Sequence, residues 1–149
     1  MRSVVQRVRD CSVTVEGTRI SSIQRGILVY LGVGREDTEQ DAAFMAEKVV
    51  HLRLFTDEQG KMNLSVLDVG GEVMVVSQFT LYGDTRKGRR PSYDDAAPPA
   101  QAELLLQLFL NHLEKYGIKP QTGKFQAKMD VSYTNEGPIT LLIDSKKTF

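Results

Sequence analysis

The sequence predicts an α+β fold in which an antiparallel, barrel-like β-sheet carries two packed helices. Strand patterns dominate the chain, and only two helix-length patterns interrupt them, without a regular alternation of strand and helix. Residues 27–31 form a near-continuous apolar run that is typical of a central strand. Residues 124–133 alternate between apolar and polar side chains, which predicts another strand. The 149 residues suit a single domain over residues 1–149 with an adequate core.

The first strands are predicted from alternation and turn residues. Residues 3–9 alternate weakly, and Arg7 shares a partly apolar face with Val5. An arginine at this position is either an ordinary surface residue or an inward-facing one that needs a partner. Residues 13–15 and 20–23 form two short strands, joined by a hairpin turn at residues 16–17.

Both helices are predicted from apolar residues at helical spacing. The first runs from Glu39 to about Leu52, with Asp37 or Thr38 as its cap. The second opens at residues 98–99, where proline is tolerated, and ends at Gly117. The apolar stripe of the second helix is interpreted as core and not as a surface for a partner.

A buried strand over residues 73–76 ends in polar side chains. Ser77, Gln78 and Thr80 follow it directly, and residues 82–84 are typical of a turn. An unpaired buried polar group costs roughly 1–3 kcal/mol, so these side chains either find partners, face water, or form a site. The last strands are expected over 124–133 and 139–144, with residues 135–138 interrupting the pattern.

Composition restricts the class of protein. Nineteen basic residues balance nineteen acidic ones, so the whole chain exerts no net attraction on nucleic acid. The single cysteine, Cys11, excludes an intramolecular disulfide framework. The N-terminus lacks the apolar region of a signal peptide, and no apolar run is long enough to span a bilayer, so we expect a cytoplasmic protein without membrane contact.

One dense basic cluster lies in a loop, and it is either simply solvated or a phosphate-contacting patch. Its members are Arg86, Lys87, Arg89 and Arg90.

The two histidines, His51 and His112, have no ligand partners at metal-binding spacing, so neither a metal nor a cofactor is expected. Hydroxyl nucleophiles at residues 77 and 80 lack an evident base. A hydrolase built on these residues is expected to rely on positioning and on backbone donors that stabilise an oxyanion.

Two separated motifs resemble one enzyme family. Residues 77–81, Ser-Gln-Phe-Thr-Leu, and residues 135–140, Asn-Glu-Gly-Pro-Ile-Thr, strongly resemble the D-aminoacyl-tRNA deacylases, also called D-tyrosyl-tRNA deacylases. Residues 1–8, 61–64 and 88–91 fit the same family, so the resemblance covers essentially the whole chain. Gln126 departs from the glycine expected before residues 127–129. Its side chain is expected to face outward on a strand, with little effect.

The resemblance implies an activity and an assembly. Members of the family hydrolyse the ester that joins a D-amino acid to the 3′-terminal adenosine of tRNA, and they also remove glycine. They act as homodimers, and the active site lies at the interface between the Ser-Gln-Phe-Thr segment of one subunit and the Gly-Pro segment of the other. The Gly-Pro bond is cis in the family. The backbone carbonyls of this segment reject an L side chain by collision.

The resemblance also assigns roles to residues. Catalytic positions are Ser77, Gln78 and Thr80, with Thr80 acting by positioning more than as a nucleophile. Substrate-binding positions are Arg7, Phe79, Met129, Asn135, Gly137 and Pro138. The 2′-hydroxyl of the terminal adenosine helps to activate water. A non-catalytic RNA-binding homodimer, a structural dimer and a different ester hydrolase remain as alternatives.

Overall fold

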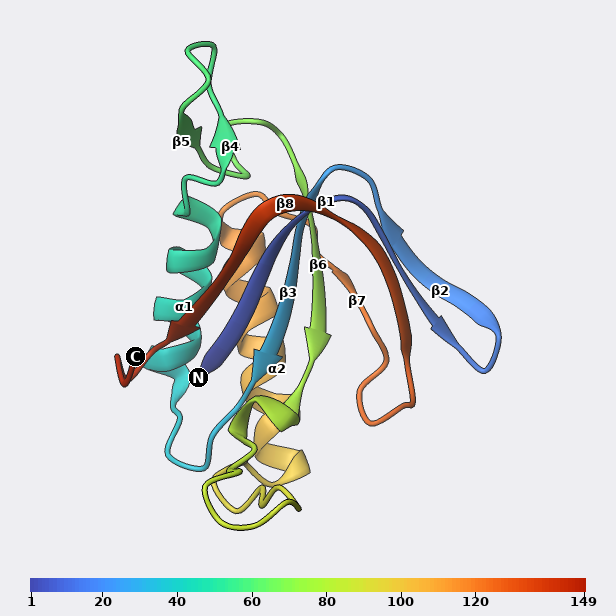
Figure 1. Ribbon diagram of the computed structural model, residues 1–149, viewed down its shortest axis with the longest axis vertical. Helices are drawn as coiled ribbons and strands as arrows, with labels where there is room; N and C mark the ends of the chain where they lie inside the picture. Colours follow the sequence, from blue (N-terminus) through green and yellow to red (C-terminus); the bar gives the residue numbers. More distant parts are fainter.

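The computed structural model describes residues 1–149 as a curved sheet with two helices on one side (Figure 1). A short two-stranded arm projects beyond the sheet. The elements in chain order are β1 Arg2–Val15, β2 Thr18–Ile23, β3 Gly26–Gly32, α1 Glu39–His51, β4 Phe55–Thr56, β5 Met62–Leu64, β6 Glu72–Ser77, the 3-10 helix η1 Phe79–Tyr82, α2 Pro99–Lys115, β7 Gln121–Thr122 and β8 Asp130–Asp144.

The sheet is barrel-like, as predicted, but it is mixed and not antiparallel. Its order is β2-β1-β3-β6-β7, and β8 also pairs with β1. All pairings of β1 are antiparallel, whereas β6 runs parallel to both β3 and β7. The prediction of an antiparallel sheet is therefore wrong for this half. The physical reason is that α1 lies on the connection from β3 to β6, and α2 on the connection from β6 to β7. A connection that contains a helix is long enough to bring the chain back to the opposite end of the sheet, so the next strand can run parallel to the one before it.

Two hydrophobic clusters explain why the central strands are apolar on both faces. On β6, Val73 and Val75 pack into the cluster that contains both helices. Met74 and Val76, the alternating residues, point into a second cluster inside the curved sheet. A strand buried on both faces has no polar face to show, which accounts for its continuous apolar run.

The helices form where the sequence predicts them. Thr38 and Asp41 form a capping box at the start of α1, which spans thirteen residues. The second helix opens with proline in its first turn. Gly117 follows its end with a φ of +81°, a conformation that glycine adopts without steric cost. None of the helices combines the length and the apolar character that a membrane crossing requires.

Strands β1 and β8 bend together over the top of the molecule (Figure 1). Between the pairs Gln6–Thr140 and Val8–Asn135, β1 advances by two residues while β8 advances by five. The additional residues of β8 form a bulge at the bend. The predicted interruption of the pattern at 135–138 is thus a bulge within one continuous strand, and not a gap between two strands.

The strand predicted to begin at Lys124 begins at Asp130 instead. Residues 124–129 form a turn, in which the amide of Ala127 donates to the carbonyl of Lys124. Gln126 has a φ of +61°, so its backbone is left-handed and not extended. The alternation of side chains misled the prediction because this turn also alternates between exposed and half-buried residues.

Phe109 tests the packing of the helical layer. This side chain is fully buried between α2, α1 and the sheet, whereas Leu104 on the same helix is 61% exposed. We expect Phe109→Ala to lower the free energy of unfolding by about 3–5 kcal/mol, because it leaves a cavity in the larger cluster. The control Leu104→Ala should change it by less than about 0.5 kcal/mol. Urea denaturation measures both, and equal losses would contradict this packing.

Candidate active site

A cavity of about 720 Å³ opens at the C-terminal end of β6. Its walls come from four parts of the chain: the segment after β3, the end of β6 with η1, the loop before α2 with the start of that helix, and the turn before β8 with the start of that strand. Seven of the lining residues have charged, polar, aromatic or sulfur-containing side chains that border its open side or its polar wall: Arg35, Ser77, Gln78, Phe79, Tyr93, Gln126 and Met129. The remaining ones are apolar, so the cavity suits an organic group with a few polar atoms at one wall.

The polar wall is the junction between β6 and η1. The amide of Gln78 donates to the carbonyl of Leu31 at 2.8 Å, which fixes the end of β6 against β3. The amides of Phe79 and Thr80 open η1, and the first N–H groups of a helix have no partner within it. The Gln78 side-chain amide donates to the Thr80 hydroxyl, which leaves the hydroxyl proton free to donate outward. The wall therefore offers several hydrogen-bond donors to a bound group.

No protein base accompanies these hydroxyl groups. Neither Ser77 nor Thr80 hydrogen-bonds to a carboxylate, an imidazole or an amine in the structure. Burial, with a smaller contribution from the carboxylate of Asp10, raises the pKa of the Cys11 thiol to about 11, so this thiol stays protonated and unreactive at neutral pH. The arrangement can bind and polarise an ester, but it does not generate a protein nucleophile.

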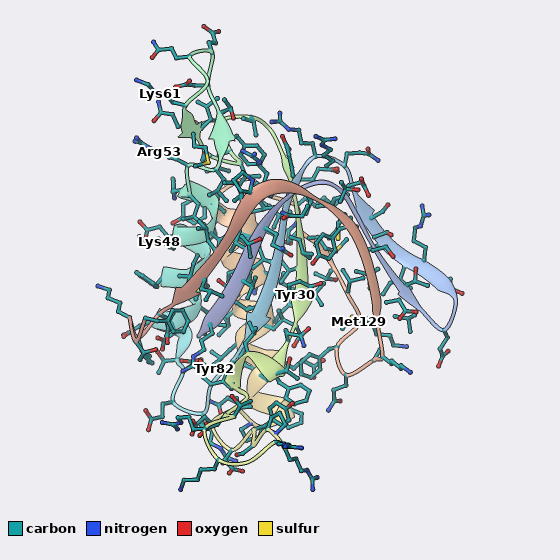
Figure 2. The ribbon with its side chains drawn as sticks, in the orientation of Figure 1. Tyr30, Lys48, Arg53, Lys61, Tyr82 and Met129 are labelled. Atoms are coloured by element: carbon teal, nitrogen blue, oxygen red, sulfur yellow. The ribbon has the colours of Figure 1, made fainter.

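Aromatic and sulfur-containing side chains shape the opening. The rings of Phe79 and Tyr93 meet edge to face with their centroids 5.1 Å apart, and Phe79 is 56% exposed. Met129 lies on the turn before β8, as Figure 2 shows. A Cβ at Gly123 would lie 2.4 Å from the Met129 sulfur, so this glycine provides the space in which the thioether packs.

The second motif lies at the bulge of β8. Arg7 is only 6% exposed, and its guanidinium donates to the carbonyls of Leu54, Glu136 at 3.3 Å and Gly137 at 3.4 Å. The side-chain amide of Asn135 donates to the carbonyl of Arg7 at 2.9 Å and to that of Ile139 at 3.0 Å. The two hydrogen bonds of Asn135 connect the residues on either side of the bulge and keep them close together. The Gly137–Pro138 peptide bond is cis, and both residues are exposed.

One chain does not bring the two motifs together. The bulge lies at the top of Figure 1, where β8 crosses β1, whereas β6 ends in the lower part of the picture. Residues 132–140 contribute nothing to the lining of the cavity. The predicted residues thus divide into one group at the cavity and one group at the bulge. The first contains Ser77, Gln78, Phe79 and Met129, with Thr80 beside them; the second contains Arg7, Asn135, Gly137 and Pro138.

The basic loop is closed at its base and exposed at its tip. Asp84 and Ser92 exchange two backbone hydrogen bonds across it. Arg86 donates to both carboxylate oxygens of Asp84, and these hydrogen bonds lower the pKa of that carboxyl to about 2. Arg86 is therefore neutralised within its own loop. The other three basic residues of the cluster form no ion pair in the structure.

Sequence reasoning assigned no role at the cavity to Arg35, Tyr93 or Gln126. Arg35 follows a glycine-rich end of a strand, and Tyr93 follows the basic loop, so both lie outside the two motifs of residues 77–81 and 135–140. The one available signal was Gln126, the departure from an expected glycine. The structure contains no group of three or more side chains of the metal-ligating types placed to hold an ion.

Comparisons with known proteins agree over the full chain. The family model described as D-Tyr-tRNA(Tyr) deacylase matches residues 4–144. The D-aminoacyl-tRNA deacylase of Thermosipho africanus (strain TCF52B) is 55% identical over 149 residues, and that of Desulfitobacterium hafniense (strain Y51) is 58% identical; in both cases the match covers 100% of each chain.

Solved structures share the fold. A c-Myc DNA unwinding element binding protein superimposes with a TM-score of 0.91 at 43% identity, over 97% of this chain and 98% of its own. A probable eukaryotic D-amino acid tRNA deacylase gives a TM-score of 0.82 at 16% identity, over 95% of this chain and 97% of its own, which shows the fold alone.

The fold and the full-length identities first define a class: this chain is a hydrolase. More specifically, it belongs to the D-aminoacyl-tRNA deacylase family, as the resemblance of its two motifs predicted.

Gln126 provides a test of the turn beside the cavity. Its left-handed backbone favours glycine and strongly disfavours a β-branched residue. We expect Gln126→Val to lower the free energy of unfolding by about 1 kcal/mol, because a β-branched side chain crowds a left-handed backbone more than the unbranched glutamine does. Gln126→Gly should change it by less than about 1 kcal/mol, because steric relief offsets the added chain entropy. Denaturation curves of the two variants measure these free energies. Equal stability of the valine and glycine variants would contradict a left-handed backbone at residue 126.

Proposed function

We propose that this protein hydrolyses the ester bond between a D-amino acid and the 3′-terminal adenosine of tRNA. The products are the free D-amino acid and tRNA. Family membership supports the reaction class. The observation that carries the proposal is the cavity at the end of β6, which is bordered by the backbone and hydroxyl groups of residues 77–80 without a protein base. The substrate predicts a cytoplasmic location, where aminoacyl-tRNA is made and used.

Hydrolysis proceeds by stabilising charge on the ester carbonyl. Water attacks the carbonyl carbon, and negative charge develops on its oxygen. The bond from that carbon to the ribose 3′ oxygen then breaks, and the 3′ oxygen takes up the proton that the attacking water loses. The amides of Phe79 and Thr80 and the Thr80 hydroxyl are the donors available to that oxyanion. The 2′-hydroxyl of the adenosine assists the activation of water, which compensates for the missing base. Ser77 and Gln78 orient the donors, and Phe79 and Met129 shape the pocket.

Selection of the D-amino acid depends on the Gly137–Pro138 segment of a second subunit. The backbone carbonyls of this segment close one side of the bound α-carbon. An L side chain collides with them, and a D side chain points away. Glycine has no side chain to collide, so its tRNA ester is also a substrate. Arg7 supports the segment by donating to the carbonyl groups of Glu136 and Gly137. Asn135 holds the two ends of the bulge together by donating to the carbonyls of Arg7 and Ile139.

A homodimer completes the site in this proposal. The exposed bulge cannot reach the cavity of its own chain, and β8 pairs with β1 alone. Exposed apolar residues continue along β8, with Leu142 at 65% and Leu141 at 37% exposure. A twofold axis makes the same contact twice, so each subunit supplies its bulge to the cavity of the other.

The basic loop contacts tRNA phosphates. Lys87, Arg89 and Arg90 are exposed and free of carboxylate partners, whereas Arg86 is held by Asp84. Tyr93 at the base of the loop packs against Phe79 at the cavity, so a backbone bound by the loop leads toward the reactive end. The contact is local, because the net charge of the chain is zero.

Thr80→Ala tests the role of the hydroxyl. If Thr80 positions the substrate and donates to the oxyanion, kcat for D-Tyr-tRNA falls about 10- to 100-fold, because the backbone donors remain. Thr80→Ser, which keeps the hydroxyl, serves as the control and retains most activity. A loss of about 10⁴-fold or more in Thr80→Ala would instead identify a covalent nucleophile.

Subunit complementation tests the shared site. Gln78→Ala damages the cavity, and Gly137→Leu fills the space that the bulge leaves open; a Cβ at Gly137 meets no atom within 4 Å of its own chain, so the fold tolerates it. Each variant alone should be nearly inactive. Co-expressed variants form about one-half mixed dimers, each with one intact site, so about one quarter of the activity returns. No recovery in purified mixed dimers would contradict a site made from two subunits.

A further inference from the structure

One cation borders the cavity. Among the residues that line it, Arg35 alone carries a charge, and all others are apolar or neutral polar. Arg35 is exposed, so it lies at the mouth and not in the interior. It lies three residues after the end of β3 and is separate from the basic cluster of residues 86–90.

The backbone of Arg35 is held in place on both sides. Its amide donates to the carbonyl of Asp95 at 3.0 Å, and its carbonyl accepts from the side chain of Gln101 at 2.9 Å. The neighbouring residues Gly34 and Ala96 form an antiparallel bridge. This ladder also forms the wall of the cavity, so the arginine is attached to a rigid part of it.

The guanidinium of Arg35 retains most of its binding capacity. Its Nε donates to the backbone carbonyl of Asp94, and no carboxylate lies within ion-pair distance. The carboxylate of Asp94 itself accepts from the hydroxyl of Ser92 at 2.8 Å. Both terminal amino groups of Arg35 therefore remain free. A planar pair of such groups matches the oxygens of a phosphate, with a charge-assisted hydrogen bond at each nitrogen.

We infer that Arg35 binds the phosphodiester group on the 5′ side of the terminal adenosine. The inference rests on the proposed function, which places the aminoacyl ester at the donors of residues 78–80. The 5′ phosphate lies on the opposite side of the ribose from that ester, and the rest of the tRNA leaves the cavity from it. The phosphate therefore passes through the mouth, where Arg35 supplies the one positive charge. Arg35 thus acts as a positioning residue that sets how deeply the nucleoside enters.

The test compares substrates with and without this phosphate. D-Tyr-tRNA carries it, and D-tyrosyl-adenosine lacks it. We expect Arg35→Ala to raise KM for the tRNA ester about tenfold and to leave KM for the adenosine ester unchanged. The slope of log KM against log salt should fall by about 0.7, the value for one lost phosphate contact to a single strand. Arg35→Lys should recover part of the affinity that Arg35→Ala loses, because lysine keeps the positive charge but lacks the planar pair of amino groups that binds two phosphate oxygens at once.

One control variant and one binding measurement separate this inference from the proposed function. Arg19→Ala removes one exposed positive charge from β2, outside the cavity, and should change neither KM. Binding of a fluorescein-labelled RNA trimer that ends in adenosine, measured by fluorescence anisotropy, gives a readout without hydrolysis, and its Kd should rise about tenfold in Arg35→Ala.

The outcomes distinguish the two claims. A wild-type protein that hydrolyses neither ester contradicts the proposed function, and the trimer still reports on Arg35. Equal changes in KM for both esters, or a trimer whose binding is the same in wild type and Arg35→Ala, would overturn the assignment of Arg35 to the phosphate.

Discussion

The buried guanidinium of Arg7 is the interaction that fixes the conformation of the β8 bulge, and the proposed site depends on it. A buried charge is costly unless its hydrogen bonds are made. Arg7 makes them to backbone carbonyls of Leu54, Glu136 and Gly137, with the Glu136 carboxylate 3.8 Å from its Nε. These partners join β1, the connection after α1, and the bulge of β8. The conformation of an exposed segment is thereby fixed from the interior of the fold.

The mixed sheet places the cavity, which is the other half of the proposed site. Because β6 lies between two parallel neighbours, its C-terminal end meets the start of α2 and the loop after β3. Strand β6 is buried on both faces until Val76, and the polar residues begin where that burial ends. The cavity and the exposed bulge thus lie at different places on the same sheet. In the proposed dimer, the bulge of one subunit lies at the cavity of the other.

The sequence predicts local features better than pairings. The bounds and cap of α1 follow from residues close together in the chain, and so does the polar end of β6. The parallel pairing of β3 and β6 depends on a long crossover, which no local pattern encodes. Gln126 was misplaced because an alternating turn resembles a strand. Arg35 was missed because its importance arises only when the segment around Ala96 closes the cavity beside it.

The most direct test of the central claim is the hydrolysis of D-Tyr-tRNA and L-Tyr-tRNA, measured side by side in the presence of a chelator. The account predicts rapid loss of the D ester while the L ester remains intact, since a wall of backbone carbonyls rejects the L side chain whatever its chemistry. Loss of both esters would leave an esterase without the proposed chiral selection. Loss of neither would contradict the deacylase proposal itself.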